Sequence, residues 1–388
     1  MMMNRAKSNL QFHHQPAWQT IMPRRPYFPP EIVAEVLQWL PVKSILKFRC
    51  VSKLWLSLIS SDHFIQSRPK KPRVLTKFMT RFSLQFMDCC CLESALCSRT
   101  CGEMPIPFPV EADCERISIV DSCNGLLCLA TDQHVILWNP AIRESKMVPH
   151  VAAAEVEPRP YYHEIGFGFG ESCGDYKVVK LIEGREDQPE LLRRIVVSVY
   201  SLKTDSWKTI ENIEGKLKSP QGKFVDGKLY WPMVYTCGHR EWKQYSGKAV
   251  VGVLCLDVKT ETYEEIEPLS PKPDAPKSLT VAVLDGRLCL LSNSSNNEKT
   301  FWVLMKNKQQ QSQSWSKMFR IFAGGRGMGQ TTPLYKLSKS ELLLHCYDSV
   351  MIYNAKDKSF RYTGLSKCSS AHVYFESMIS PAKYHQRS

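Results

Sequence analysis

The amino-acid sequence predicts an α+β multidomain protein, in which a small three-helix unit is followed by an all-β, propeller-like domain of about six blades. Three observations support this prediction. Apolar residues recur at helical spacing between residues 27 and 67, a four-strand pattern recurs five times between residues 117 and 363, and a basic, proline-containing linker at residues 68–72 separates the two regions. A chain of 388 residues can bury two hydrophobic cores, so two domains are expected.

The helical unit is expected at residues 26–67, after a polar segment at residues 1–25 that should be a disordered tail. Pro29-Pro30 opens the first helix, and Pro41 ends it because proline disfavours helix in the residue before it. Two more short helices should follow, the last ending near residues 62–64. The apolar positions of the three helices are Ile32, Val33, Val36, Leu37, Leu40, Val42, Ile45, Leu46, Phe48, Val51, Leu54, Trp55, Leu58 and Ile59.

This helical unit has more apolar side chains than about forty residues can enclose. A disulfide cannot stabilise it, because Cys50 is its single cysteine. We therefore expect an exposed apolar face, which marks a protein interface. The alternative is an ordinary core segment of three helices.

The order of residue types in this unit resembles an F-box of the plant type. The matching residues are Phe28-Pro29, Ile32-Val33, Glu35-Val36-Leu37, Leu40-Pro41-Val42-Lys43-Ser44, Leu46, Phe48-Arg49-Cys50-Val51, Lys53, Trp55 and Phe64. Phe28 and Val36 stand where leucine and isoleucine are more usual, but both remain apolar. The resemblance implies docking onto a Skp-type adaptor, and through it onto the cullin and RING protein of a ubiquitin ligase. The residues expected to contact the adaptor are Pro29, Ile32, Leu37, Leu40, Pro41, Leu46 and Val51.

The net charge of +13 lies mainly at the start of the chain, where residues 1–80 hold 13 lysines and arginines against three acids. Such a region could meet nucleic acid, anionic lipid or an acidic protein. An acidic protein is expected, because the resemblance implies that Skp-type adaptors are acidic; nucleic acid is not the expected partner.

Neither membrane insertion nor secretion is expected. The longest apolar run, residues 249–256, is too short to cross a bilayer, and the first residues contain no apolar signal segment. The 15 cysteines follow no regular framework, and several fall inside apolar strands, which indicates free, buried thiols. We expect a reducing compartment, the cytoplasm and/or the nucleus.

The strand pattern after the linker predicts the propeller, residues 73–381, with a short tail at 382–388. Each copy has two strands joined by a tight turn, a connection, a third strand, a short polar turn and a fourth strand. The five copies are residues 117–148, 165–210, 222–266, 279–322 and 333–363. Residues 73–110 supply a sixth blade, which residues 371–381 complete by adding a strand, so that the ring has no open edge.

This domain lacks the regular Gly-Gly pairs of a kelch array and resembles the plant F-box-associated domain instead. The segments that carry the resemblance are Cys123–Leu129, Trp138–Glu144, Gly166–Leu181, Val199–Lys208 and Tyr374–Pro381.

Long connections should gather on one face of the propeller. With strands lettered A to D from the inside, B–C and D–A connections share a face, and the long ones are residues 183–193, 233–247, 149–164, 211–221, 267–278 and 323–332. Rigid scaffolds display binding residues on such loops, and Tyr, Trp and Arg dominate protein interfaces. The residues expected to bind a target protein are Tyr161, Arg185, Arg193, Tyr235, Arg240, Trp242, Tyr245 and Arg326.

Other signals do not indicate a catalytic or metal site, and no cofactor is expected. Gly166–Gly170 and Gly324–Gly329 do not match a phosphate-binding loop, so GFGFG should be a blade strand beside a close neighbour. The cysteines at 89–91, 97 and 101 lack paired CxxC spacing for zinc, and His345 lies in a strand pattern.

The sequence therefore predicts a non-catalytic substrate-recognition subunit of an SCF-type (Skp-cullin-F-box) ubiquitin ligase, which captures a target protein for ubiquitination and degradation. The alternatives are a non-ligase F-box scaffold or propeller-based binding protein, an enzyme built on a propeller, and a nucleic-acid-binding propeller.

Overall fold

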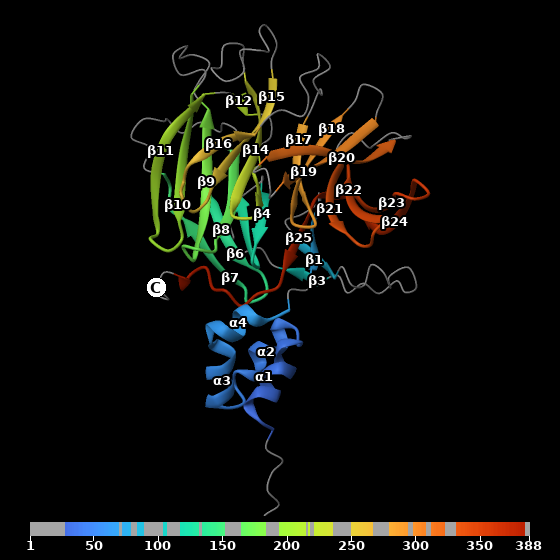
Figure 1. The fold of residues 1–388 in the computed structure, drawn as a ribbon. Coiled ribbons are helices and arrows are strands. Elements are labelled where there is room, and N and C mark those ends of the chain that lie inside the picture. Colours follow the sequence, from blue (N-terminus) through green and yellow to red (C-terminus); the bar gives the residue numbers. More distant parts are fainter. Residues whose placement is uncertain are drawn as a thin grey trace, which may run out of the picture.

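The computed structural model describes residues 28–69, 72–78, 84–88, 104–106, 117–131, 134–151, 164–183, 194–214, 216–217, 221–235, 250–266, 279–293, 298–307, 312–322 and 331–384. Within these ranges a group of short helices lies beneath one face of a ring of β-sheets (Figure 1).

The helical unit contains four helices, one more than predicted: α1 Pro30–Gln38, α2 Val42–Phe48, α3 Lys53–Ser60 and α4 Asp62–Ser67. The extra helix arises at Ser61. Its extended backbone ends α3, while its hydroxyl oxygen accepts the Phe64 N–H (3.2 Å) as the N-cap of α4. The chain therefore turns and forms another helix where the apolar pattern alone predicts an end.

The described strands form six sheets, each a blade of the propeller. Blade 1 is β25 Cys368–Phe375, β1 Pro72–Phe78, β2 Leu84–Asp88 and β3 Met104–Ile106; blade 2 is β4 Ser118–Cys123, β5 Leu126–Ala130, β6 Val135–Asn139 and β7 Glu144–Val148; blade 3 is β8 Glu164–Gly170, β9 Asp175–Glu183, β10 Arg194–Ser201 and β11 Ser206–Glu214. Blade 4 is β12 Lys216–Leu217, β13 Lys223–Val225, β14 Lys228–Tyr235, β15 Val250–Asp257 and β16 Tyr263–Ile266; blade 5 is β17 Leu279–Leu284, β18 Arg287–Asn293, β19 Glu298–Asn307 and β20 Ser312–Phe322; blade 6 is β21 Thr331–Lys336, β22 Glu341–Cys346, β23 Ser349–Asn354 and β24 Ser359–Ser366. The five predicted copies are blades 2 to 6.

The ring closes through β25, as predicted. This strand pairs antiparallel with β1, with Val373 opposite Val74, although it begins at Cys368 rather than Ala371 and ends at Phe375. The innermost strands contact one another in the order β25, β4, β8, β13, β17, β21 and back to β25. The β1 edge is thereby paired, which removes an open edge from the ring.

The hydrophobic core is divided into six clusters, and each lies between two neighbouring blades. Trp231 of β14, for example, packs against Val179 and Leu181 of β9 within the cluster between blades 3 and 4. None of these six clusters includes a residue of the helices, which have a separate cluster around Leu37, Ile45 and Phe64.

The GFGFG segment is the inner strand β8, and its glycines make room for neighbours, as predicted. A Cβ atom on Gly166 would lie 2.5 Å from the Trp231 ring, and one on Gly168 would lie 2.3 Å from the Phe224 ring. Real Cβ contacts are not this short, so the two rings occupy the space that side chains would need.

The turns that join strands A–B and C–D emerge on the face beside the helices, which we call the helix-side face. The long-loop face is the opposite one. Asp285-Gly286, an A–B turn, has positive φ at both residues (51° and 66°), as a two-residue hairpin turn requires. The described part of residues 211–221 is mostly strand, not loop as predicted, because buried Ile213 and Leu217 extend the sheets there.

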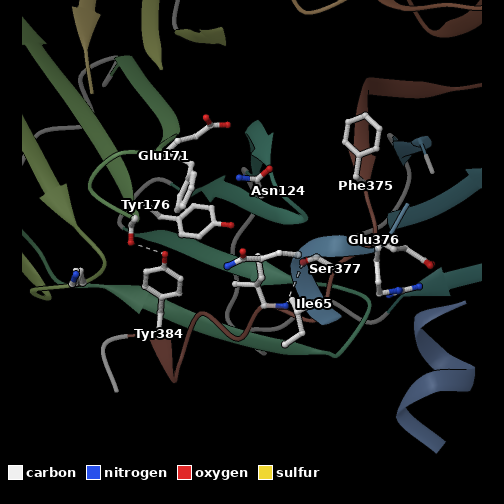
Figure 2. Close-up of a pocket in the computed structure, with 14 residues that line it drawn as sticks. Ile65, Asn124, Glu171, Tyr176, Phe375, Glu376, Ser377 and Tyr384 are labelled. Atoms are coloured by element: carbon white, nitrogen blue, oxygen red, sulfur yellow. Dashed lines mark hydrogen bonds between the residues drawn. The ribbon is translucent and has the colours of Figure 1, made fainter. Parts of the chain in front are cut away.

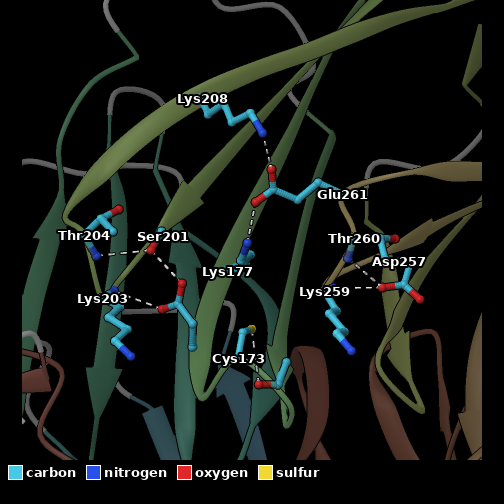
Figure 3. A network of polar contacts seen from close by, with 12 residues as sticks. Cys173, Lys177, Ser201, Lys203, Thr204, Lys208, Asp257, Lys259, Thr260 and Glu261 are labelled. Atoms are coloured by element: carbon cyan, nitrogen blue, oxygen red, sulfur yellow. Dashed lines mark hydrogen bonds and ion pairs between the residues drawn. The ribbon is translucent and has the colours of Figure 1, made fainter. Parts of the chain in front are cut away.

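Polar contacts hold neighbouring blades together near these turns (Figure 3). The Glu261 carboxylate, in the C–D turn of blade 4, pairs with Lys177 and with Lys208 (2.9 Å), both from blade 3. Burial acts to raise the pKa of Glu261, but hydrogen bonds and charge from the two lysines outweigh burial and hold that pKa below its usual value. Lys146 of blade 2 likewise pairs with Asp205 in the C–D turn of blade 3 (2.8 Å).

Candidate protein-binding surfaces

The helical unit has an inner and an outer face, each made by residues at helical spacing. Along α1 and the two residues after it, Val33, Leu37 and Leu40 pack in the helical core, while Ile32, Val36 and Trp39 are exposed. The outward residues are 45%, 58% and 59% exposed. The other large apolar residues exposed on this unit are Phe28, Val51, Leu54 and Leu56.

This exposed apolar surface is accompanied by positive charge. Lys43 and Lys47 of α2, Arg49 and Lys53 are all exposed. A partner that covers the surface would therefore combine apolar residues with acidic ones.

The structure divides the predicted adaptor-contact residues into three groups. Pro29, Ile32, Pro41 and Val51 are exposed, and Leu40 and Leu46 are half-buried. Leu37 is only 2% exposed, so it is a core residue that supports the surface rather than a contact residue. The exposed apolar surface also includes Phe28, Val36, Trp39, Leu54 and Leu56, which the prediction did not name as contacts; the 32-36-39 spacing is a sequence signal for two of them.

The predicted target-binding residues lie almost entirely outside the described residues: Tyr161, Arg185, Arg193, Arg240, Trp242, Tyr245 and Arg326. Tyr235 is the exception, and its backbone is the last position of β14, paired with Val250. The described ends of β14 and β15 reach the long-loop face, so the connection between them starts and ends there.

One described residue on the long-loop face, Tyr347, has the properties of a contact residue. It lies in the short B–C turn between β22 and β23, where Cys346 pairs with Ser349. Its side chain is 64% exposed and its φ is 57°, a conformation that costs energy for a bulky residue. The backbone carbonyl of Asp348 accepts the Cys368 N–H (3.0 Å), which anchors the turn to the chain leading into β25.

The central channel holds a cavity of about 530 Å³ lined by the inner strands. Asp121 of β4 and Lys223 of β13 pair across part of it (3.5 Å). His345, 9% exposed, is a strand histidine as predicted, with Nε2 3.1 Å from the Cys368 carbonyl oxygen. Burial, with the nearby Lys223 and His345, lowers the pKa of His372 well below its usual value, so His372 is neutral at neutral pH.

A second cavity, of about 540 Å³, lies where α4 meets the propeller and the C-terminal segment (Figure 2). Aromatic rings line much of it: Phe169, Tyr176, Phe375 and Tyr384. Burial raises the pKa of Tyr176 well above its usual value, so this phenol stays neutral.

The described residues provide no cluster of three or more histidines, cysteines or acids that could hold a metal ion. The cysteines at positions 89–91, 97 and 101 lie outside the described ranges. Cys128, Cys255, Cys289 and Cys346 are free and buried, as predicted. Among the helices that the structure describes, none is long and apolar enough to cross a membrane.

The fold and its surfaces define a two-part class of protein: a small helical unit with an exposed apolar face, on one side of a closed propeller. Comparison with known families agrees with both parts. Residues 27–67 match the F-box domain, and residues 81–379 match the F-box associated beta propeller domain. The chain belongs to the family of F-box proteins that carry this propeller.

Similar proteins extend over most of the chain. An F-box/kelch-repeat protein from Arabidopsis thaliana is 25% identical over 378 residues, which covers 91% of this chain and 95% of the relative. An F-box protein from the same plant is 25% identical over 86% of this chain and 79% of its own. Among solved structures, TolB from Acinetobacter baumannii covers 84% of this chain and 71% of its own with 11% identity and a TM-score of 0.42, a similarity from which no conclusion follows.

Proposed function

We propose that the protein is the substrate-recognition subunit of an SCF-type ubiquitin ligase. The F-box binds a Skp-type adaptor, and the propeller holds a target protein within reach of the ubiquitin-carrying enzyme. The protein itself is non-catalytic: it raises the local concentration of two reactants and makes the transfer effectively intramolecular. A subunit with this function would act in the cytoplasm and/or the nucleus.

The observation that carries the proposal is the exposed apolar face of the F-box. Ile32, Val36 and Val51 are at least 45% exposed although a folded core lies directly beneath them. Covering each such side chain contributes roughly 1.5–3 kcal/mol. A free surface of this kind is explained by a partner that covers it.

The adaptor interface is tested by placing a charge on the exposed face. Ile32→Asp and Val36→Asp, each in the full-length chain, should weaken adaptor binding by about tenfold or more, since about 1.4 kcal/mol corresponds to a factor of ten. Both positions are exposed, so the fold should survive. Met147→Asp is the matched control, because Met147 is 49% exposed on the propeller. Unchanged adaptor binding by both F-box variants would refute the proposed docking.

The target interface is proposed on the long-loop face, which lies away from the F-box. Tyr161, Arg185, Arg193, Tyr235, Arg240, Trp242, Tyr245 and Arg326 are its proposed contact residues, from their position in the sequence. Tyr347 joins them from the structure, because a rigid, exposed aromatic side chain loses little entropy on binding.

The target side is tested separately from the adaptor side. Replacing Arg240, Trp242 and Tyr245 together by alanine should abolish capture of a target identified with the wild-type chain, while adaptor binding stays intact. With the adaptor, cullin and RING protein added, the wild-type chain should support ubiquitination of that target. Capture without ubiquitination would instead show a scaffold that works outside the ligase.

A further inference from the structure

Two segments of the chain join the F-box to the propeller. The first is the predicted linker, residues 68–72. The second is residues 376–384, which we call the C-terminal strap; they follow β25, run along the helix-side face toward blade 3 (Figure 1) and contact the F-box on the way. The strap is not part of any sheet, but hydrogen bonds and an ion pair fix it to the propeller.

The strap is fastened to blade 2 by Asn139, the last residue of β6. Asn139 is fully buried, and its side-chain Nδ2 donates to the backbone carbonyls of Ser377 (3.0 Å) and Ile379 (2.8 Å). The Ser380 hydroxyl donates to the Glu144 carboxylate, also on blade 2. Buried hydrogen bonds of this kind are costly to lose, because the freed polar groups stay out of water.

The path of the strap leaves no free space over the first turn of blade 2. A Cβ atom on Gly125 would lie 2.3 Å from the Ser377 Oγ and 2.6 Å from the Phe375 carbonyl oxygen. Gly125 also has a φ of 87°, which favours glycine independently. Both the turn and the strap are therefore held in one arrangement.

The far end of the strap is fastened to blade 3. The Tyr384 hydroxyl donates to the Gly174 carbonyl (2.8 Å), and its ring packs edge-on against Tyr176 with centroids 5.1 Å apart (Figure 2). The strap thus spans two blades and cannot swing away from the propeller without breaking contacts at both ends.

Between these anchors the strap enters the F-box. Met378 is 7% exposed and belongs to the same cluster as Leu37, Ile45 and Phe64 of the helices. Ala141 and Ile142, from the turn that follows Asn139, pack against that cluster as well. The helical core is therefore completed by residues of the propeller domain.

Described residues on either side of residues 70–71 also make specific contacts. The Arg68 guanidinium donates from Nη2 to the Leu40 carbonyl at the end of α1 (2.6 Å). Glu376, the first residue of the strap, pairs with Arg73 of β1 (3.0 Å). The start of β1 and the start of the strap are thus joined by an ion pair.

We propose that the C-terminal strap is the positioning element that fixes the F-box at one angle to the propeller, with Asn139 as its principal anchor. Domains joined by a single short linker generally move relative to one another. A second connection, in which a strap hydrogen-bonded to the propeller packs Met378 into the F-box core, removes that freedom. Under the proposed function, the angle would decide where a bound target stands relative to the ubiquitin donor; the strap contacts themselves do not depend on that function.

The test measures the distance between the two domains in the full-length chain bound to the adaptor. Spin labels on unnatural amino acids at Ser60 of α3 and Lys259 of blade 4, both exposed, report this distance by pulsed electron resonance. The wild-type chain should give one narrow distance distribution. Asn139→Ala should broaden it, while the propeller stays folded at the temperature of the measurement.

Asn354→Ala is the matched control. Asn354 occupies the same place in blade 6, and its side-chain oxygen accepts the Lys356 N–H (3.0 Å), just as that of Asn139 accepts the Ala141 N–H (3.0 Å). The Asn354→Ala variant should lose this turn hydrogen bond without broadening the distance distribution. A second variant, a chain ending at Glu376, lacks the rest of the strap but retains all of β25, and should broaden the distribution further.

The proposal is overturned if the wild-type distribution is already broad, or if Asn139→Ala and the shortened chain remain as narrow as the wild type. Should the wild-type chain fail to bind the adaptor, the proposed function fails; the same labels in the free chain then still decide whether the strap fixes the angle.

Discussion

Polar side chains add to the hydrophobic contacts that hold neighbouring blades together, and Glu261 is the clearest case. Its carboxylate is 17% exposed and is shared by Lys177, 10% exposed, and Lys208. Removing the carboxylate would leave the Lys177 ammonium group largely buried without its partner. Breaking such a pair is more costly than breaking one in solvent.

Glu261→Gln should lower the free energy of unfolding by about 1–3 kcal/mol at neutral pH. Because the folded-state pKa of Glu261 lies below its usual value of 4.5, its contribution is complete above that pH and is lost as the pH falls through the lowered pKa. Thermal unfolding between pH 7 and pH 3 should thus show a gap between wild type and variant that closes in acid. Glu264→Gln, which affects a pair whose carboxylate is 52% exposed, should show a much smaller gap; equal gaps would contradict this account.

Gly166 is the second residue whose role can be measured. Gly166→Ala would place a methyl group 2.5 Å from the fully buried Trp231 ring, so the core between blades 3 and 4 must shift. We expect a loss of about 1–3 kcal/mol in denaturant unfolding. Gly170→Ala, in the same strand, would meet Cys173 Sγ (2.5 Å), the end of a half-buried side chain that can move, and should cost less. A larger loss at Gly170 would show that crowding at Trp231 is not the reason for the glycine.

At the scale of elements, strand periodicity predicted blades 2 to 6 and the closing strand, because each strand buries residues against a neighbouring blade. The same patterns could not predict α4 or the strap. The α4 helix depends on the Ser61 cap, a local hydrogen bond inside an otherwise continuous apolar run. The strap forms no helix or strand, so its sequence has no periodicity that would reveal it. Its path depends on hydrogen bonds to Asn139, which is far away in the sequence.

The exposed face of the F-box could also be predicted only in part from the sequence. Helical spacing predicts that the F-box has an apolar face, but not which of its faces the propeller covers. Leu37 and Val36 are adjacent and both apolar, yet one is 2% and the other 58% exposed. Packing against α2, α4 and Met378 decides between them, and Met378 lies more than 300 residues away in the sequence.

The Ser61 cap leads to a prediction for the helical element. The Ser61 hydroxyl donates to the Leu58 carbonyl (2.8 Å) and accepts the Phe64 N–H (3.2 Å), so one side chain serves both α3 and α4. Ser61→Ala should lower F-box stability by about 1 kcal/mol. Hydrogen exchange should be faster at the amides of α4 but not in blades 4 and 5. Ser57→Ala, at an exposed position within α3, is the control and should change little.

At the scale of the whole molecule, the C-terminal region contains two adjacent segments with different structural roles. Residues 368–375 close the ring, and residues 376–384 join the ring to the F-box. Tyr374 is 1% exposed in the core between blades 1 and 2, and Cys368 and Ala371 are buried in the core between blades 6 and 1. Removing β25 would open both cores and expose the inner edge of β1.

These two tasks predict a stepwise response to shortening the chain. A chain ending at Tyr384 should unfold like the full-length protein. One ending at Glu376 should keep the propeller transition but free the F-box to move. For a chain ending at Lys367, the free energy of unfolding of the propeller should fall by more than about 5 kcal/mol, because a fully buried aromatic residue and a whole inner strand are gone. This is as large as the total stability of many domains. Calorimetry of the three chains checks this order. A propeller transition retained at Lys367 would show that the ring does not need its closing strand, and one already lost at Glu376 would show that the strap belongs to the propeller fold itself.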